Sequence, residues 1–153
     1  QTLGPDPLSD DFTLERFAAI LAGQRVQLKG LLRNQGTIGG IGNAYSDEIL
    51  HVAKLSPFAI AGSLDDATVT RLYAALRDTL SAAVAAASGK PAAQLKDAKR
   101  AGMRVHRRPG ESCPQCGYIL REVSFADSSL QYCATYQTGG KPLADRRTSK
   151  FLK

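Results

Sequence analysis

The hydrophobic positions in the first half of the chain recur with the spacing of amphipathic helices. Residues 1–12 are expected to be extended, because two prolines there oppose a helix. The pattern then predicts a helix over residues 13–23, a short one over 26–34, and a third over 43–53 with Asn43 as its N-cap. The side chains expected to face inward from the second helix are Val26, Leu28, Leu31 and Leu32.

The longest predicted helix begins at Ser63 or Asp65 and runs to about Ala87. Beyond it, residues 90–110 lose the apolar pattern and carry seven basic residues against one acidic residue. That composition is typical of a basic linker or loop.

Two short stretches near the C-terminal end, residues 118–123 and 129–132, alternate between apolar and polar positions and predict a small β-hairpin. The expected fold class is therefore mainly α, with a hairpin appended to a helical domain. The predicted divisions are a helical domain over 1–89, a basic linker over 90–110, a hairpin over 111–139 and a basic tail over 140–153.

The 153 residues carry a net charge of +6 that is unevenly distributed. Residues 1–88 hold 7 basic and 9 acidic side chains, a net of −2, whereas residues 89–153 hold 13 and 5, a net of +8. A basic excess confined to one part predicts contact with a polyanion there, and a solubilising surface is the alternative. No apolar run approaches the roughly 18 residues of a membrane-spanning helix, and no signal segment is recognisable, so an integral membrane protein is not expected.

A glycine-rich turn, residues 38–42, lies between the second and third predicted helices. Gly40 and Gly42 allow the backbone to turn sharply and to expose N–H groups at the start of a helix. Such a turn binds a phosphate, and Asn43 offers an amide to the same anion. A tight helix–helix turn without any ligand is the alternative.

Basic side chains also gather in the segment that leads into the predicted hairpin. Such residues neutralise phosphates and give salt-dependent affinity that is largely independent of sequence, and a solvated face is again the alternative. The basic residues concerned are Lys96, Lys99, Arg100, Arg104, Arg107 and Arg108.

Two cysteines, Cys113 and Cys116, are separated by two residues, and Cys133 follows after sixteen more. Thiolates spaced in this way match a tetrahedral zinc site that a returning hairpin completes. The fourth ligand is expected three residues after Cys133, where neutral Tyr136 is a poor ligand. Zinc then sits on three thiolates plus water or another donor, of which His106 is the nearest candidate, or the finger folds without metal. The odd number of cysteines favours a reducing intracellular compartment over a disulfide framework.

Four segments, taken in order, resemble the C-terminal half of the formamidopyrimidine-DNA glycosylase / endonuclease VIII family. They are residues 6–12 (DPLSDDF), 40–48 (GIGNAYSDE), 105–117 (VHRRPGESCPQCG) and 132–137 (YCATYQ). The resemblance spans nearly the whole chain. It implies a helix–two-turns–helix (H2TH) DNA-binding domain followed by a zinc-finger hairpin of the zinc-ribbon kind. Members of the family use these parts to hold the phosphates around a flipped, damaged nucleotide.

The resemblance also implies roles for particular residues. Asn43 matches the family's phosphate-binding asparagine, and Lys29 matches a lysine that approaches the same backbone. The amides of Gly40 and Gly42 belong to that grip. Three of the family's four zinc ligands are matched by Cys113, Cys116 and Cys133. With the fourth missing, we expect weak or substoichiometric zinc.

Three departures from the family pattern bear on function. The family's catalytic domain begins with a proline, whose amine attacks the sugar, and a glutamate, whereas this sequence begins with Gln1. The fourth ligand position holds Tyr136, and Ser128 stands where the family has an arginine that reaches the lesion.

We therefore expect a DNA-binding protein without catalytic activity, which grips the backbone of duplex DNA that is damaged or distorted. No small-molecule substrate and no membrane partner are expected, and the location is expected to be cytoplasmic, with the nucleoid. One alternative is a glycosylase or abasic-site lyase, if the chain is a piece of a longer enzyme. The other is an RNA- or ribosome-binding module.

Overall fold

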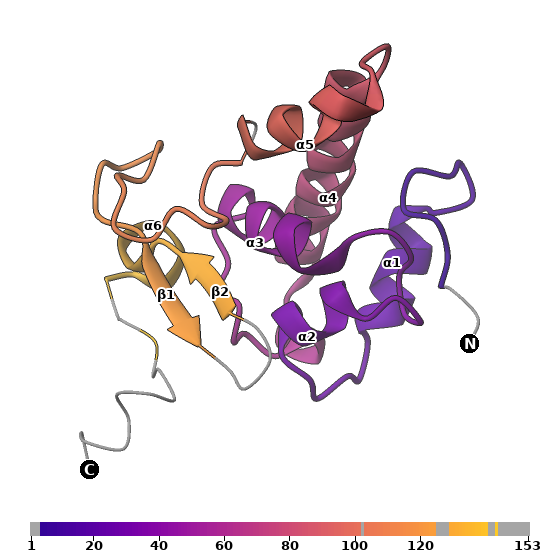
Figure 1. Cartoon of the computed structure of the whole chain (residues 1–153). Coiled ribbons are helices and arrows are strands. Elements are labelled where there is room, and N and C mark those ends of the chain that lie inside the picture. Colours follow the sequence, from indigo (N-terminus) through magenta and orange to yellow (C-terminus); the bar gives the residue numbers. More distant parts are fainter. Residues whose placement is uncertain (1–3, 102, 125–128, 141–142, 144–153) are drawn as a thin grey trace.

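The computed structural model describes residues 4–101, 103–124, 129–140 and 143. Within these residues the fold is mainly helical with one two-stranded antiparallel hairpin, as predicted (Figure 1). The elements are α1 (Leu14–Leu21), α2 (Leu28–Arg33), α3 (Gly42–Val52), the short 3-10 helix η1 (Ala61–Ser63), α4 (Asp66–Ala87), α5 (Ala92–Ala101), β1 (Arg121–Ser124), β2 (Ser129–Tyr132) and α6 (Ala134–Thr138).

Helices α1 to α4 enclose the main hydrophobic core. Thr13 caps α1, as predicted, by accepting a hydrogen bond from the backbone N–H of Arg16 at 3.2 Å. The rings of Phe12, Phe17 and Tyr73 lie 5.8 to 6.0 Å apart between α1 and α4. The Tyr73 hydroxyl donates to the backbone carbonyl of Phe12 at 2.6 Å. This aromatic cluster attaches the long helix to the N-terminal segment.

Helix α2 is shorter than predicted, and Val26 is 45% exposed instead of facing inward. The reason is a local pairing of extended segments. Gln27 forms a β-bridge with Ile60, and the carbonyl of Val26 accepts a hydrogen bond from Ala61 at 2.9 Å. The backbone at Gln27 is therefore extended, and the helix begins only at Leu28.

The predicted linker contains a helix. Residues 92–101 form α5, which packs against α4, so part of the segment predicted as a linker or loop is helical. Alanine, glutamine and lysine are strong helix formers, and Pro91 directly precedes the first turn, where a proline is well tolerated. The segment lacks an apolar stripe, and the side chains described in it, those of residues 92–95 and 99, are exposed.

The hairpin pairs Arg121 with Tyr132 and Ser124 with Ser129. Its first strand begins three residues later than predicted, because Ile119 bridges to Ser112 instead and is 64% exposed. Figure 1 shows α3 in the middle of the molecule, between the other helices and the hairpin. Most of the predicted basic tail, residues 140–153, lies outside the described residues. None of the described helices is long and apolar enough to cross a membrane.

Candidate functional site

One face of α3 connects the helical domain to the finger. Asn43, Asp47 and His51 follow one another at four-residue intervals, so their side chains lie on the same side of the helix. Asn43 lies in the first turn of α3 and does not cap it, because the N-cap is Ile41. The prediction of Asn43 as the cap was therefore wrong, and its amide is available for other partners.

Lys29 of α2 lies against this face instead of at the surface. Its Nζ donates to Asp47 Oδ1 at 2.5 Å and to the carbonyl of Asn43 at 2.8 Å, and the residue is only 5% exposed. Burial lowers the pKa of Lys29, and the Asp47 carboxylate opposes that shift. The amine is thus engaged within the protein, and a phosphate contact from Lys29 stays a prediction.

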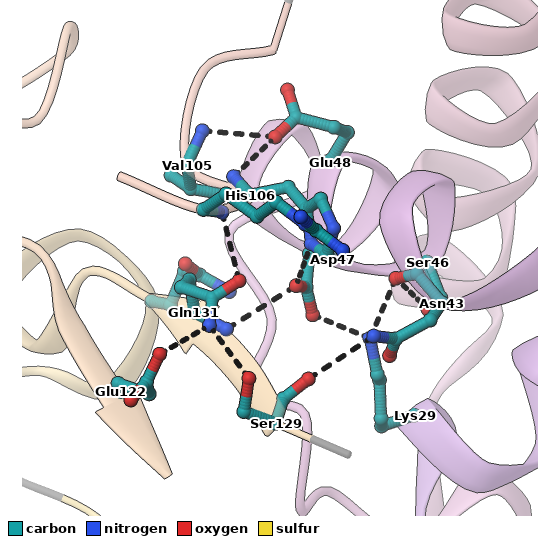
Figure 2. Close-up of polar contacts among 12 residues, drawn as sticks. Lys29, Asn43, Ser46, Asp47, Glu48, Val105, His106, Glu122, Ser129 and Gln131 are labelled. Carbon is teal, nitrogen blue, oxygen red and sulfur yellow. Dashed lines mark hydrogen bonds and ion pairs between the residues drawn. The ribbon is translucent and has the colours of Figure 1, made fainter. Parts of the chain in front are cut away.

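Asp47 joins three separate segments (Figure 2). Its Oδ1 accepts from Lys29, while Oδ2 accepts from the ring Nδ1 of His106 at 2.8 Å and from the backbone N–H of Gln131 at 3.2 Å. His106 is therefore packed against α3. The structure does not bring it to the cysteines as an alternative metal donor.

Glu48, the next residue, holds the segment that leads into the finger. Oε1 accepts the backbone N–H of Arg104 at 2.6 Å, and Oε2 accepts those of Val105 and His106 at 2.8 and 2.9 Å. Sequence reasoning missed both acids, since their place in the first turns of a helix is explained by the helix dipole alone. The signal available in the sequence was the position of both acids directly before Ile49, a core residue. The helix is buried on most sides there, so the acids are buried with it.

A pocket of about 480 Å³ opens where α3 meets the hairpin. It is lined by Asn43, His106, Arg107, Pro109, Glu122, Ser129 and Gln131. The Asn43 Nδ2 donates to the carbonyl of Ser129 at 3.2 Å, and its buried Oδ1 has no partner in the described part of the chain. The pocket therefore brings Asn43 together with Arg107, two of the predicted DNA-binding residues.

Arg107 is held in an unusual backbone conformation. Its φ is 59°, in the left-handed region, and its N–H donates to Gln131 Oε1 at 2.9 Å. Gln131 is fixed in turn by donating to Glu122 Oε2 at 2.8 Å and to Ser129 Oγ at 3.1 Å. The exposed Arg107 guanidinium has no hydrogen bond or ion pair to any described residue, so it is free to bind an anion.

The other basic residues predicted to contact DNA differ in their exposure and in their partners. Arg104 is half-buried beside this segment, whereas Arg108 donates to the carbonyl of Met103 at 2.7 Å and pairs with Glu111 at 3.0 Å. Lys99 is exposed and lies over the ring of Tyr45. The side chains of Lys96 and Arg100, and all of Ser128, lie outside the described residues.

The glycine-rich turn has the predicted backbone. The φ of Gly40 is 84° and that of Gly42 is 70°, conformations that side-chain-bearing residues rarely adopt. The N–H of Gly40 donates to Gln35 Oε1 at 2.8 Å and is therefore occupied. The role of these amides in holding a phosphate stays a prediction.

The three cysteines converge as predicted. Their Sγ atoms all lie within 4.8 Å of one another, and those of Cys116 and Cys133 are 3.3 Å apart, so the cluster can hold a metal ion. Burial raises the pKa of the Cys133 thiol to about 12. Tyr136, at the family's fourth position, lies with its ring against that of His51, the centroids 4.9 Å apart.

His51 is a second site residue that sequence reasoning missed. It is completely buried, and its Nε2 lies 3.1 Å from Cys113 Sγ. Burial and then the charge of Arg104 lower the pKa of His51 to about 4. On the sequence, a lone histidine in an apolar helical pattern reads as a core residue.

Comparison with known proteins identifies the family to which this architecture belongs. Residues 3–94 match the formamidopyrimidine-DNA glycosylase H2TH domain. The chain belongs to the formamidopyrimidine-DNA glycosylase family. The chain is 56% identical over its whole length to a formamidopyrimidine-DNA glycosylase-like protein of Mycobacterium tuberculosis, of which it covers 96%.

Full glycosylases of the family are longer. The chain is 37% identical to formamidopyrimidine-DNA glycosylase of Symbiobacterium thermophilum and covers 50% of it, so it spans about half of that relative. The structure of MutM (Fpg) from Thermus thermophilus superimposes with a TM-score of 0.79 at 34% identity, over 92% of this chain and 55% of that one. Lactococcus lactis Fpg, solved with DNA containing N7-benzyl-Fapy-dG, gives 0.78 at 25% identity, over 88% and 51%.

Proposed function

We propose that this chain binds the phosphate backbone of duplex DNA at a distorted or damaged position, without cutting it. The observation that carries the proposal is the pocket between α3 and the hairpin, which is lined by Asn43 and by Arg107, whose guanidinium has no ion pair to any described residue. Donors of these two kinds are suited to phosphate oxygens. The DNA-bound structures of Lactococcus lactis Fpg share the fold around this pocket and support the proposal.

The absence of cutting is supported by the placement of Lys29, which contacts the pocket residue Asn43. A lyase of this family type needs an exposed amine that attacks a sugar carbon. The Lys29 Nζ donates two hydrogen bonds and lies 5% exposed, so it is poorly placed for such an attack. Such a protein would work on chromosomal DNA, in the nucleoid.

Fluorescence anisotropy with labelled duplexes tests DNA binding. The probes are an intact duplex, a gapped duplex and one with an abasic-site analogue, each titrated at several salt concentrations. We expect affinity to fall steeply with salt and Asn43→Ala to weaken binding about tenfold, the size expected for losing one hydrogen bond to a charged group. Arg107→Gln should weaken binding to all three duplexes and reduce the salt slope by about 1.

The matched control is Arg16→Gln. Arg16 is exposed on α1, at the other end of the molecule from the hairpin (Figure 1). Its removal changes the net charge as Arg107→Gln does, and the affinity should stay nearly the same. Binding that is absent at low salt, or that Asn43→Ala and Arg16→Gln weaken equally, refutes the proposed interface.

Borohydride trapping on a duplex with an abasic site tests the absence of cutting. A lyase that passes through a Schiff base is captured as a covalent protein–DNA adduct, and we expect none. An adduct would identify the chain as an active lyase. Competition between the duplex and a structured RNA tests the alternative of an RNA-binding module. We expect duplex DNA to compete better than the RNA.

A further inference from the structure

We propose that His51 of α3 is the fourth ligand of a zinc ion bound by Cys113, Cys116 and Cys133, which makes the site a Cys₃His centre shared between the helical domain and the finger. The sequence alone gives three zinc ligands, and His51 raises the number to four. Counting along the finger finds three thiols and a tyrosine, whereas the fold brings a nitrogen donor from a residue 62 positions before Cys113.

Structural zinc in proteins is almost always bound by four ligands in a tetrahedron. The three Sγ atoms lie within 4.8 Å of one another, which suits three corners of such a site. Tyr136 stands at the position of the fourth cysteine, but its ring is used for packing. It contacts the His51 ring, with the centroids 4.9 Å apart, and the Lys54 ammonium group, which lies 5.0 Å from its centroid.

His51 has the donor that the finger lacks. Its Nε2 lies 3.1 Å from Cys113 Sγ, and the side chain is completely buried. In a tetrahedral site with Zn–S of about 2.3 Å and Zn–N of about 2.0 Å, a sulfur and a nitrogen ligand lie roughly 3.5 Å apart. Relative to Cys113, a shift of about half an ångström converts the present thiol–imidazole contact into two bonds to one metal. His51 lies outside the group of ligand atoms that are within 4.8 Å of one another, so its Nε2 must also approach Cys116 or Cys133 by more than about 1 Å when the metal binds.

The environment of the ring also points to a ligand. The Nδ1 of His51 is buried and has no hydrogen-bond partner among the described residues, so Cys113 is the polar group that the ring contacts. Burying an imidazole for one weak contact with a thiol is costly. Coordination of zinc through Nε2 would offset the free-energy cost of burying the ring.

Zinc binding by these four residues exchanges protons for the metal ion. Zn²⁺ enters, three thiols each release a proton to solvent, and the neutral imidazole donates its Nε2 lone pair, so no oxidant or reductant is needed. The ion would tie α3 directly to the finger. The same helix presents Asn43 to the proposed DNA pocket, so the metal would also fix the finger relative to that pocket.

The test measures zinc in the purified full chain under reducing conditions. We expect one zinc per chain by elemental analysis and a first shell of three sulfurs and one nitrogen, with imidazole outer-shell scattering, by X-ray absorption. His51→Phe fills the same volume without a donor. It should weaken zinc at least tenfold in competition with a chromogenic chelator and should remove the imidazole scattering.

Two further variants make the result specific. Tyr136→Phe should leave zinc content and affinity unchanged, because the phenol is not a ligand. The double variant His51→Phe with Tyr136→Cys restores a four-thiolate set and should recover one zinc per chain, which also shows that the His51→Phe background still folds.

Wild-type protein without stoichiometric zinc, an oxygen ligand in place of nitrogen, or unchanged affinity in His51→Phe would each overturn the assignment. In those cases His51 is a packed core histidine bonded to Cys113. The measurement uses no DNA, so its outcome is independent of the proposed DNA-binding function.

Discussion

Replacing Glu48 with alanine should release the segment that leads into the finger. The Glu48 carboxylate accepts three consecutive backbone N–H groups, those of Arg104, Val105 and His106, at 2.6 to 2.9 Å. Val105 is completely buried, so its N–H cannot turn to water once the carboxylate is removed. The neighbouring acid Asp47 does not replace it, because that carboxylate is occupied by Lys29 and by the His106 ring.

The magnitude follows from these bonds. A buried donor left without a partner costs about 1–3 kcal/mol. The other two N–H groups are partly buried, and each loses a bond worth roughly 0.5–1.5 kcal/mol after water replaces part of it. The sum is about 2–6 kcal/mol, and a loss of about 3 kcal/mol, in the lower half of that range, is already a large share of the roughly 5–15 kcal/mol that stabilises a domain. Glu48→Gln retains one acceptor oxygen and should cost about half as much.

Urea denaturation and hydrogen exchange measure the two consequences. With a slope of about 2 kcal/mol per molar urea, Glu48→Ala should lower the midpoint by about 1.5 M. The amides of Val105 and His106 should lose exchange protection while those of α4 keep theirs. The control is Glu111→Ala, which removes a surface pair with Arg108 and should cost under about 1 kcal/mol.

The reasoning is refuted if Glu48→Ala shifts the midpoint no more than Glu111→Ala does. It is also refuted if exchange at residues 105 and 106 is unchanged, because the carboxylate would then not be what holds that segment.

Other residues give further predictions. Asp47→Asn leaves the buried Lys29 ammonium group without its partner and should cost about 3 kcal/mol in urea unfolding, and adding Lys29→Met should cost less than the sum of the single changes in a double-mutant cycle. Tyr73→Phe removes the 2.6 Å hydrogen bond to the backbone before α1 and should lower the free energy of unfolding by about 1 kcal/mol. Gly30→Ala should raise the thermal midpoint, because Gly30 lies in a helix and an added Cβ would meet open space. Gly42→Ala should lower the midpoint, because the φ of Gly42 is 70°. Shifts of the same sign would contradict the backbone argument.

The sequence predicts the elements that bury an apolar face. Helices α1 and α4 and the hairpin follow from periodicity, and the three cysteines converge because their spacing fits one site. Helix α5 was missed because its residues favour a helix by propensity while burying little, so the apolar stripe that marks a helix is absent.

The parts that sequence reasoning could not give depend on contacts between distant segments. The acids Asp47 and Glu48 look like first-turn residues of a solvent-facing helix until the 104–106 segment is folded against them. His51 looks like a core histidine until Cys113 is brought to it from the finger. In each case the partner is more than fifty positions away, and no local pattern records which residue it will be.

The equal spacing of Asn43, Asp47 and His51 along α3 limits how the length of this chain can vary. Adding or deleting one residue within the helix turns everything beyond it by about 100°. An insertion after Asp47 would leave Asn43 and Asp47 in place but turn Glu48 away from the 104–106 segment and His51 away from the cysteines. We therefore expect length changes among related chains to fall in the turn between α4 and α5 and to be absent between residues 43 and 51.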